Sequence, residues 1–195
     1  MRYKKALLIV DVQNDFCPRG ALAVSEGDKV VPVINRYIRV FLRRKLLIFS
    51  CRDWHPKKTK HFKSFGGLWP EHCVQGTRGA RYHPKLKLPK NTIIVSKGME
   101  PEKDSYSSFQ AKDKAGHSFY SVLKELGAKE LYIAGLATDY CVKFSALDAL
   151  KKGLKVNILL DAVKGVNLKP DDSTKAIQLL VKKGARILNL RKLKL

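Results

Sequence analysis

Cys141 is the residue whose type and position most strongly suggest chemistry in this chain. It follows a short apolar run at residues 131–136 and opens a stretch of helical apolar spacing at residues 139–152. Thr138 or Asp139 can cap that helix, which places Cys141 in its first turn. We expect the helix dipole to lower the pKa of the thiol and to favour the nucleophilic thiolate. Taken alone, such a cysteine is more often a small buried apolar residue.

Polar groups also end three other apolar runs. Asp11 follows residues 6–10, Asp53 follows residues 46–51, and Lys97 follows residues 92–96. Ligands gather at the carboxyl ends of strands in open parallel sheets. If the groups converge, Asp11 can accept the thiol proton, and Lys97 can hold Asp11 ionised and favour the thiolate. Singly, Asp11 is equally well a turn residue and Lys97 a surface lysine. Their shared position predicts a thiol nucleophile with its own base.

A second constellation suggests a metal ion. Asp53 and His55 form an Asp-x-His pair, and His61 and His72 follow in the irregular segment 52–90. A segment of this length without clear periodicity is uncommon in a compact domain unless it is functional. One carboxylate with several imidazoles suits Zn²⁺, Fe²⁺ or Mn²⁺, and the donor set does not choose among them. Any one of these histidines alone is more often a surface residue than a ligand.

The elements that must position these groups alternate along the chain. The strand candidates are near-continuous apolar runs, which is typical of strands covered on both faces. They are residues 6–10, 46–51, 92–96, 131–136, 156–160 and 186–190. The helix candidates are residues 28–44, 117–126, 139–152 and 172–183. This alternation predicts an α/β fold in three layers, with helices on both faces of a parallel sheet. Residues 1–195 suit one domain.

Composition excludes some classes of protein. Hydrophobic residues make up 45% of the chain, so it is not disordered. The net charge of +22 favours association with polyanions such as RNA, DNA or anionic membrane surfaces. However, no single helix or arm collects the lysines, and no RNA-binding aromatic motif accompanies them. We therefore expect the lysines to be dispersed over a solvated surface, and we expect no specific nucleic-acid partner.

The sequence also indicates a compartment. The apolar run after the basic N-terminus stops at Asp11, which is too short for a signal peptide, and no run approaches membrane-spanning length. The four cysteines form no C-x-x-C pair. We expect a cytoplasmic protein with free thiols and no membrane partner. The sequence does not give the oligomeric state, and a homo-oligomer is one alternative.

A set of motifs carries a family resemblance. They are Asp11-Val12-Gln13-Asn14-Asp15-Phe16-Cys17, Asp53-Trp54-His55-Pro56, Trp69-Pro70-Glu71-His72-Cys73-Val74, Lys97-Gly98, Asp104-Ser105-Tyr106-Ser107 and Gly135-Leu136-Ala137-Thr138-Asp139-Tyr140-Cys141-Val142. In this order, across most of the chain, they resemble the nicotinamidases, also called pyrazinamidases. These are metal-dependent members of the isochorismatase-like cysteine hydrolases. The Asp-x-His and Trp-Pro-x-His pieces indicate the nicotinamidase branch, because many relatives lack the metal.

The resemblance implies a six-stranded, mostly parallel sheet. It also implies hydrolysis of nicotinamide to nicotinate and ammonia, a step of NAD salvage, with pyrazinamide as a further substrate. Asp11, Lys97 and Cys141 would form the catalytic set, and the backbone N–H groups of Ala137 and Cys141 would form the oxyanion hole. A cis peptide bond between Leu136 and Ala137 is implied as well.

The resemblance further implies a ligand set and a substrate slot. The divalent metal, with zinc expected ahead of iron or manganese, would be held by Asp53, His55, His61 and His72. His61 varies in this role among relatives. The nicotinamide ring would lie among Phe16, Leu22, Trp69, Tyr106 and Tyr140.

Three other interpretations compete with this one. Another amide hydrolase of the superfamily would keep Asp11, Lys97 and Cys141 but would not use His55 and His72. A basic nucleic-acid-binding protein on the same fold would bind tightly, with a steep dependence on salt. A binding module with a structural metal would release no ammonia from any amide.

Overall fold

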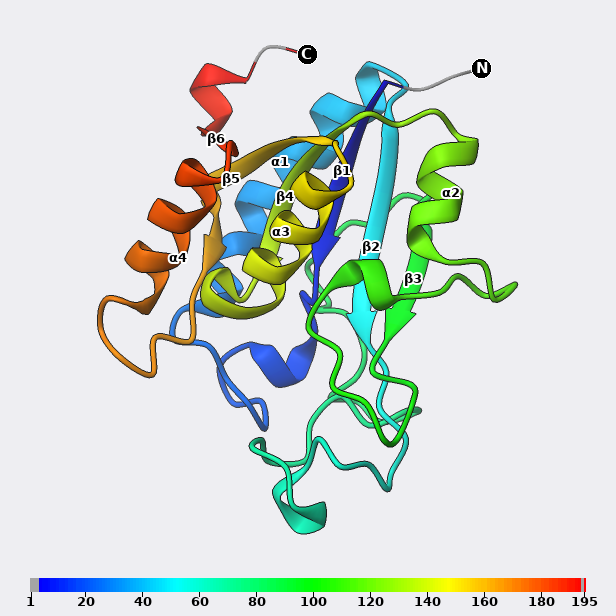
Figure 1. The fold of residues 1–195 in the computed structure, drawn as a ribbon, viewed down its shortest axis with the longest axis vertical. Coiled ribbons are helices and arrows are strands. Elements are labelled where there is room, and N and C mark those ends of the chain that lie inside the picture. The colour runs from blue at the N-terminus through cyan, green and yellow to red at the C-terminus, as the bar shows by residue number, and fades with distance from the viewer. Residues whose placement is uncertain (1–3, 194) are drawn as a thin grey trace.

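A six-stranded sheet forms the middle layer of the molecule (Figure 1). The computed structural model describes residues 4–193 and 195. The strands are β1 (Lys5–Val10), β2 (Leu47–Asp53), β3 (Ile93–Lys97), β4 (Glu130–Leu136), β5 (Lys155–Lys164) and β6 (Arg186–Leu188). Their order is β3-β2-β1-β4-β5-β6, and every neighbouring pair is parallel. The structure therefore confirms the predicted α/β class with a parallel sheet.

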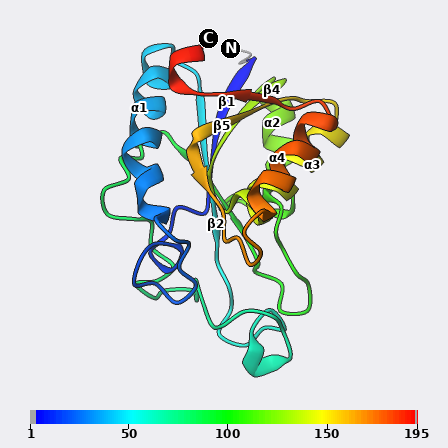
Figure 2. The same cartoon turned by 90° about the vertical axis from the view of Figure 1, so that its left-hand side faces the viewer.

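Helices cover both faces of this sheet. They are α1 (Val30–Arg43), α2 (Phe119–Glu125), α3 (Lys143–Lys151) and α4 (Asp172–Lys182). Helix α1 lies on one face and the other three lie on the opposite face (Figure 2). The predicted helices are confirmed, with ends that differ by a few residues. For example, α2 begins after Ser118, whose side chain accepts a hydrogen bond from the Ser121 amide. None of the helices in the described residues is both long enough and apolar enough to cross a membrane.

The apolar core is split by the sheet into two clusters. In β1, Leu7 and Ile9 pack with α1, whereas Leu8 and Val10 pack with α2 and α3. Because successive side chains of a strand point to opposite faces, a strand buried on both faces must be apolar at every position. This is the physical reason for the uninterrupted apolar runs in the sequence.

The irregular segment between β2 and β3 lies beyond the carboxyl edge of the sheet, at the lower end of Figure 1. Two side chains that follow β1 hold it in place. The Gln13 amide bridges Asp53 and Ala80 through their backbone groups at 2.7–2.9 Å. The Asp15 carboxylate accepts a hydrogen bond from the Cys73 amide at 2.7 Å. These buried polar contacts fix a segment that has little regular structure of its own.

Candidate active site

Four strand ends bring the predicted reactive groups together at the carboxyl edge of the sheet. Asp53 and Lys97 are the last residues of β2 and β3 and lie opposite each other in the ladder. Asp11 follows β1, and Cys141 follows β4 in the next turn of the chain. The Lys97 Nζ atom lies 2.9 Å from Asp11 Oδ2 and 3.5 Å from Cys141 Sγ, and it also contacts Asp53 Oδ1. The expected convergence of a carboxylate, an ammonium and a thiol is therefore present.

Lys97 is almost fully buried at the centre of this group. Burial by itself would lower its pKa, but the carboxylates of Asp11 and Asp53 outweigh that effect and raise the pKa well above its ordinary value. Burial would likewise raise the pKa of Asp53, yet Lys97 and the neighbouring imidazoles hold it below its ordinary value. The pair of Lys97 and Asp53 is consequently charged throughout the neutral range.

Asp11 and Cys141 behave differently from the sequence-based expectation. Burial raises the pKa of Asp11 to about 7, although Lys97 opposes that shift. Burial also raises the pKa of the Cys141 thiol well above its ordinary value; Lys97 opposes this, while the negative charge of Asp11 adds to it. The predicted lowering of the thiol pKa was therefore wrong, because desolvation outweighs the nearby positive charge. The Cys141 thiol therefore lies beside a carboxyl group whose pKa is close to neutral.

The turn that carries Cys141 also differs from the prediction. Residues Thr138–Val142 form a π-helical turn ahead of α3, and Ala137 precedes it without any side-chain cap. The Asp139 carboxylate instead accepts hydrogen bonds from the amides of Val166 and Asn167, at 2.9 and 2.7 Å. The capping prediction was wrong because this side chain ties the turn to the loop after β5. The implied cis peptide bond between Leu136 and Ala137 is present.

Three of the predicted metal-binding residues form a compact group. The potential donor atoms of Asp53, His55 and His72 all lie within 4.8 Å of one another. His55 Nδ1 is 3.0 Å from the Gly98 carbonyl oxygen, and His72 Nδ1 is 2.7 Å from the Pro70 carbonyl oxygen. Because a carbonyl can only accept, each Nδ1 carries the hydrogen, so in the neutral form of each ring Nε2 is the atom with the lone pair. Both Nε2 atoms face Asp53 Oδ2, at 3.6 and 3.9 Å.

His61 lies beside this group without being part of it. Its ring centroid is 4.7 Å from that of His55. Its Nδ1 lies 2.9 Å from Asp104 Oδ1, an exposed carboxylate on the loop after β3. In the described residues, the buried Nε2 atoms of His55 and His61 have no hydrogen-bond partner. Such unpaired acceptors are costly in a protein without a ligand, so the donor set fits a divalent metal ion.

Gly98 is required for this geometry. A Cβ atom at this position would lie 2.4 Å from His55 Cε1, and its backbone φ of +70° strongly favours glycine. The Lys97-Gly98 pair thus serves both groups. The lysine contacts the thiol, and the glycine carbonyl orients a potential metal ligand.

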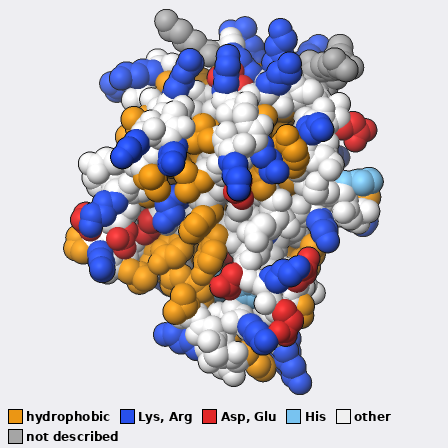
Figure 3. Space-filling view, in the orientation of Figure 1, with side chains coloured by type: hydrophobic (Ala, Val, Ile, Leu, Met, Phe, Trp, Pro, Cys, Tyr) orange, Lys and Arg blue, Asp and Glu red, His pale blue; other side chains and the backbone are white. Residues whose placement is uncertain are grey.

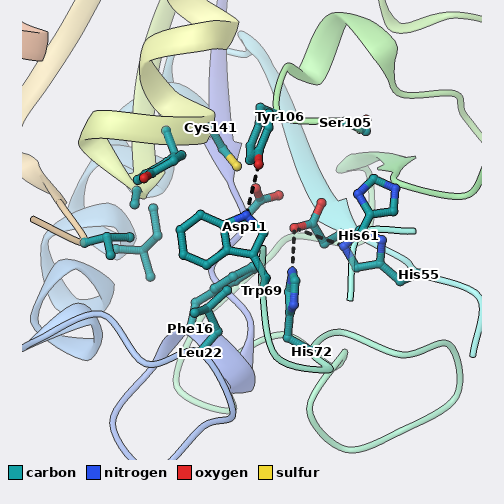
Figure 4. A pocket seen from close by; sticks show the side chains of 15 residues that line it. Asp11, Phe16, Leu22, His55, His61, Trp69, His72, Ser105, Tyr106 and Cys141 are labelled. Atoms are coloured by element: carbon teal, nitrogen blue, oxygen red, sulfur yellow. Dashed lines mark hydrogen bonds and ion pairs between the residues drawn. The ribbon is translucent and has the colours of Figure 1, made fainter. Parts of the chain in front are cut away.

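A cavity lies between the thiol and the histidines (Figure 4). It holds about 510 Å³ of space that no atom fills, part of it open to solvent. Its aromatic wall is connected, since Trp69 Nε1 donates a hydrogen bond to the Tyr106 hydroxyl at 2.9 Å and Tyr140 packs edge-on against Trp69. The predicted residues that line it are Asp11, Phe16, Leu22, Asp53, His55, His61, Trp69, His72, Tyr106, Ala137, Tyr140 and Cys141.

The sequence did not indicate three further lining residues, which are Ser105, Leu136 and Val166. Leu136 and Ser105 stand inside recognised motifs, but no role in the cavity was predicted for either of them. Val166 belongs to the loop after β5, where no motif marks it. Its backbone amide donates a hydrogen bond to the Asp139 carboxylate at 2.9 Å, which ties this loop to the turn that carries Cys141.

Comparison with known proteins is consistent with this geometry. The family described as "Isochorismatase domain" matches residues 5–192. The chain belongs to the isochorismatase family. The nicotinamidase of Escherichia coli (strain K12) is 41% identical over 202 residues, which cover 95% of each chain.

Two solved structures of this family are similar across nearly their whole length. Pyrazinamidase of Pyrococcus horikoshii in complex with zinc has a TM-score of 0.89 at 45% identity, covering 96% of this chain and 99% of that one. PnC1 from L. infantum in complex with nicotinate has a TM-score of 0.86 at 31% identity, covering 100% and 98%.

Proposed function

We propose that this protein is a nicotinamidase that forms a thioester on Cys141. It hydrolyses nicotinamide to nicotinate and ammonia, a reaction of NAD salvage, and it also accepts pyrazinamide. The observation that carries this function is a thiol with a carboxyl group and an ammonium group, buried beside a metal-type donor set in an aromatic cavity. Relatives named for both activities support it.

In the first step, Asp11 accepts the proton from the Cys141 thiol. The raised pKa of Asp11, about 7, makes this transfer less uphill than it would be to an ordinary carboxylate. The Lys97 ammonium, 3.5 Å from the sulfur, stabilises the thiolate as it forms. The sulfur then attacks the carboxamide carbon, and the carbonyl π-electrons move to oxygen. The backbone N–H groups of Ala137 and Cys141 receive this oxyanion, and each such donor contributes about 3 kcal/mol.

In the second step, the tetrahedral adduct collapses and the C–N bond breaks. Asp11 returns its proton to the departing nitrogen, so ammonia leaves and a thioester remains on Cys141. Asp11 then takes a proton from a water molecule that attacks the thioester carbon. The C–S bond breaks and Asp11 returns its proton to the sulfur. The acid that is formed loses its remaining proton to solvent and is released as nicotinate. Asp11 thus serves as base and as acid within one cycle.

The aromatic wall accounts for binding of a flat heteroaromatic ring. Phe16, Leu22, Trp69, Tyr106 and Tyr140 line the cavity, and the centroid of the Phe16 ring lies 5.5 Å from that of His72. Stacking against such side chains positions the ring so that its carboxamide reaches the sulfur. The hydrogen bond between Trp69 and Tyr106 keeps two of these side chains in one orientation.

Asp53, His55 and His72 would hold the metal ion, with His61 as a further ligand. A bound divalent ion would supply a Lewis-acidic positive charge, which anchors an electron-rich ring atom and lowers the pKa of nearby groups. We propose zinc, because the P. horikoshii relative was solved with zinc, although the donor set also suits iron or manganese. The described cysteines are all free and buried, which suits the reducing cytoplasm that we propose for the reaction.

The test combines activity with metal content. Purified protein should release ammonia from nicotinamide and from pyrazinamide, contain about one divalent metal ion per chain, and lose activity on chelation. Adding back zinc should restore the rate. Full activity in metal-free protein would instead indicate a metal-independent amide hydrolase, and no ammonia from any carboxamide would reject the enzyme altogether.

A further inference from the structure

The charges of the molecule are divided unevenly between the two edges of the sheet. Each of the helices α1 to α4 returns the chain to the amino edge, so helix ends and strand starts meet there, opposite the cavity (Figure 1). We call the exposed cations of these segments the basic edge. They are Lys4, Arg43, Arg44, Lys45, Lys124, Lys129, Lys151, Lys152, Lys155, Lys182, Lys183, Arg186, Arg191 and Lys192.

Figure 3 shows this concentration of Lys and Arg at the upper end of the molecule, where both termini lie. The acidic residues of the same helices' last turns and strand starts are Glu125, Glu130 and Asp148, and the Asp161 carboxylate accepts a hydrogen bond from the Leu190 amide of segment 190–192. Most other acidic residues lie beside the cavity or on the loops around it. The fold therefore collects cations that are scattered along the sequence, contrary to the expectation of an evenly dispersed surface.

The backbone places several of these cations next to one another. The Lys129 and Glu130 amides both donate to the Lys4 carbonyl oxygen at 3.0 Å, and the Lys155 amide donates to the Lys129 carbonyl oxygen at 3.0 Å. Lys4, Lys129 and Lys155 thus stand at the starts of three neighbouring strands. Like charges at such spacing repel one another unless an anion lies between them.

Within the described residues, no cation of the basic edge has a carboxylate within 4.0 Å. The exposed lysine pairs lie elsewhere, for example Lys60 with Glu102, Lys103 with Glu100, and Lys175 with Asp171. Lysines around the cavity are partly neutralised, whereas the basic edge has no carboxylate partner among the described residues. Lys124 and Lys152 do lie over the Tyr120 ring, at 5.9 and 4.4 Å from its centroid.

Helix stability explains only part of this pattern. A cation in the last turn of a helix is favoured by the helix dipole, which accounts for Arg43, Lys124, Lys151 and Lys182. It gives no reason for Lys4, Lys129 and Lys155, which precede or begin strands. Unpaired charge of one sign across several elements is the electrostatic footprint of a polyanion partner.

We propose that the basic edge binds the phosphate backbone of a double-stranded nucleic acid without regard to its sequence, while the cavity at the opposite edge stays open. A duplex fits better than a single strand, because segments 43–45, 124–129, 151–155, 182–186 and 190–192 contain no aromatic residue to stack on bases, and the neighbouring Tyr120 ring is already covered by the ammonium groups of Lys124 and Lys152. A duplex also fits better than a membrane surface, because the helices meet this edge end-on and present no flat amphipathic face.

The first measurement is the fluorescence anisotropy of labelled duplexes of about 20 base pairs, one of RNA and one of DNA, titrated with the intact protein. If the edge neutralises about five phosphates, log K should fall with log salt concentration with a slope of about −4.5. Two duplexes of the same length but different sequence should bind equally. A preference for RNA or for DNA would support the proposal and identify the source of the backbone.

A matched pair of variants separates location from net charge. The edge variant carries Lys4→Gln, Lys129→Gln, Lys151→Gln and Lys155→Gln. The control variant carries Lys57→Gln, Lys58→Gln, Lys63→Gln and Lys114→Gln, at exposed lysines on the other side of the molecule that form no ion pair with described residues. Both variants lose the same formal charge, and both should keep wild-type ammonia release.

We expect the edge variant to bind at least tenfold more weakly at about 150 mM salt, and its salt slope should be shallower by about one unit for each phosphate that it no longer neutralises. The control variant should stay within about twofold of wild type. Equal weakening in both variants would overturn the proposal, because net charge alone would then explain binding. So would the absence of duplex binding by the wild-type protein, or tighter binding to vesicles of anionic phospholipid than to either duplex.

Discussion

The site has two halves that are built in different ways. Asp11 stands directly after β1 and Cys141 in the turn that follows β4, whereas His61 and His72 come from the irregular segment that the Gln13 and Asp15 side chains hold. Lys97 joins the halves, since its ammonium contacts Asp11 and Cys141 on one side and Asp53 on the other. The difference suggests that the covalent chemistry depends on the sheet, while metal affinity depends on the loops.

The largest expected effect comes from the nucleophile half. Cys141→Ala should lower the rate of ammonia release by at least about 10⁴-fold, because no other group in the cavity can form the thioester. The same variant should keep its metal, as elemental analysis would check. The matched control is Cys17→Ala, which removes a buried thiol outside the cavity and should leave activity near wild type. Substantial turnover by Cys141→Ala would contradict the covalent route.

The next effect concerns the metal half. Asp53→Ala should weaken zinc binding by at least about a hundredfold, since it removes a ligand of the group and leaves a buried cation, Lys97, with a single carboxylate. Competition with a chromogenic chelator measures the affinity without reference to activity. If this variant bound zinc as tightly as the wild-type protein, Asp53 would not be a metal ligand. The ion would then be bound elsewhere, away from the group that contacts Lys97.

The pH dependence of kcat/KM tests the role of Asp11 in the nucleophile half without a substitution. Protonation of Asp11 removes the base, so kcat/KM should fall about tenfold per pH unit below the pKa of that group. Burial raises this pKa to about 7, and a bound cation would lower it, so the midpoint of the acid limb should lie at or below about pH 7. An acid limb centred well above pH 7 would rule out Asp11 as the base.

The smallest effect concerns the outer contact of the metal half. Asp104→Asn should weaken zinc binding by about tenfold, because the carboxylate at 2.9 Å orients the His61 ring and makes it a better donor. Glu102→Gln is the control, since it removes a carboxylate of the same loop that, among the described residues, pairs only with the exposed Lys60. If Asp104→Asn and Glu102→Gln both bind zinc as tightly as the wild-type protein, His61 is not a ligand. The ion would then be held by the compact group of Asp53, His55 and His72.

Much of the fold and of the site could be predicted from the sequence, for specific reasons. Strands buried on both faces leave apolar runs, and the polar residue that ends each run marks the carboxyl edge of the sheet. Asp11, Asp53, Lys97 and Cys141 follow from that rule, and the ordered motifs identified the family. The histidines could be named but not placed, because the segment that carries them has no periodicity.

What could not be predicted depends on contacts between distant residues. The predicted lowering of the Cys141 pKa was wrong because burial of the thiol outweighs the opposing effect of Lys97. The local sequence does not show how deeply a residue is buried. The predicted capping role of Asp139 was wrong because its hydrogen-bond partners, the Val166 and Asn167 amides, lie in the loop after β5. Asp104 is exposed and lies far from His61 in the chain, so only the folded loop shows their contact. The basic edge was hidden for the same reason.

The central claim is that the two halves act on one substrate through a covalent bond to Cys141. Rapid acid quenching of the zinc-loaded protein with nicotinamide, followed by intact-protein mass spectrometry, tests it most directly. The account predicts a transient species heavier by one nicotinoyl group, mapped to the Cys141 peptide and absent in Cys141→Ala. Ammonia release at the wild-type rate with no such species at any quench time, or an adduct on a different residue, would contradict it.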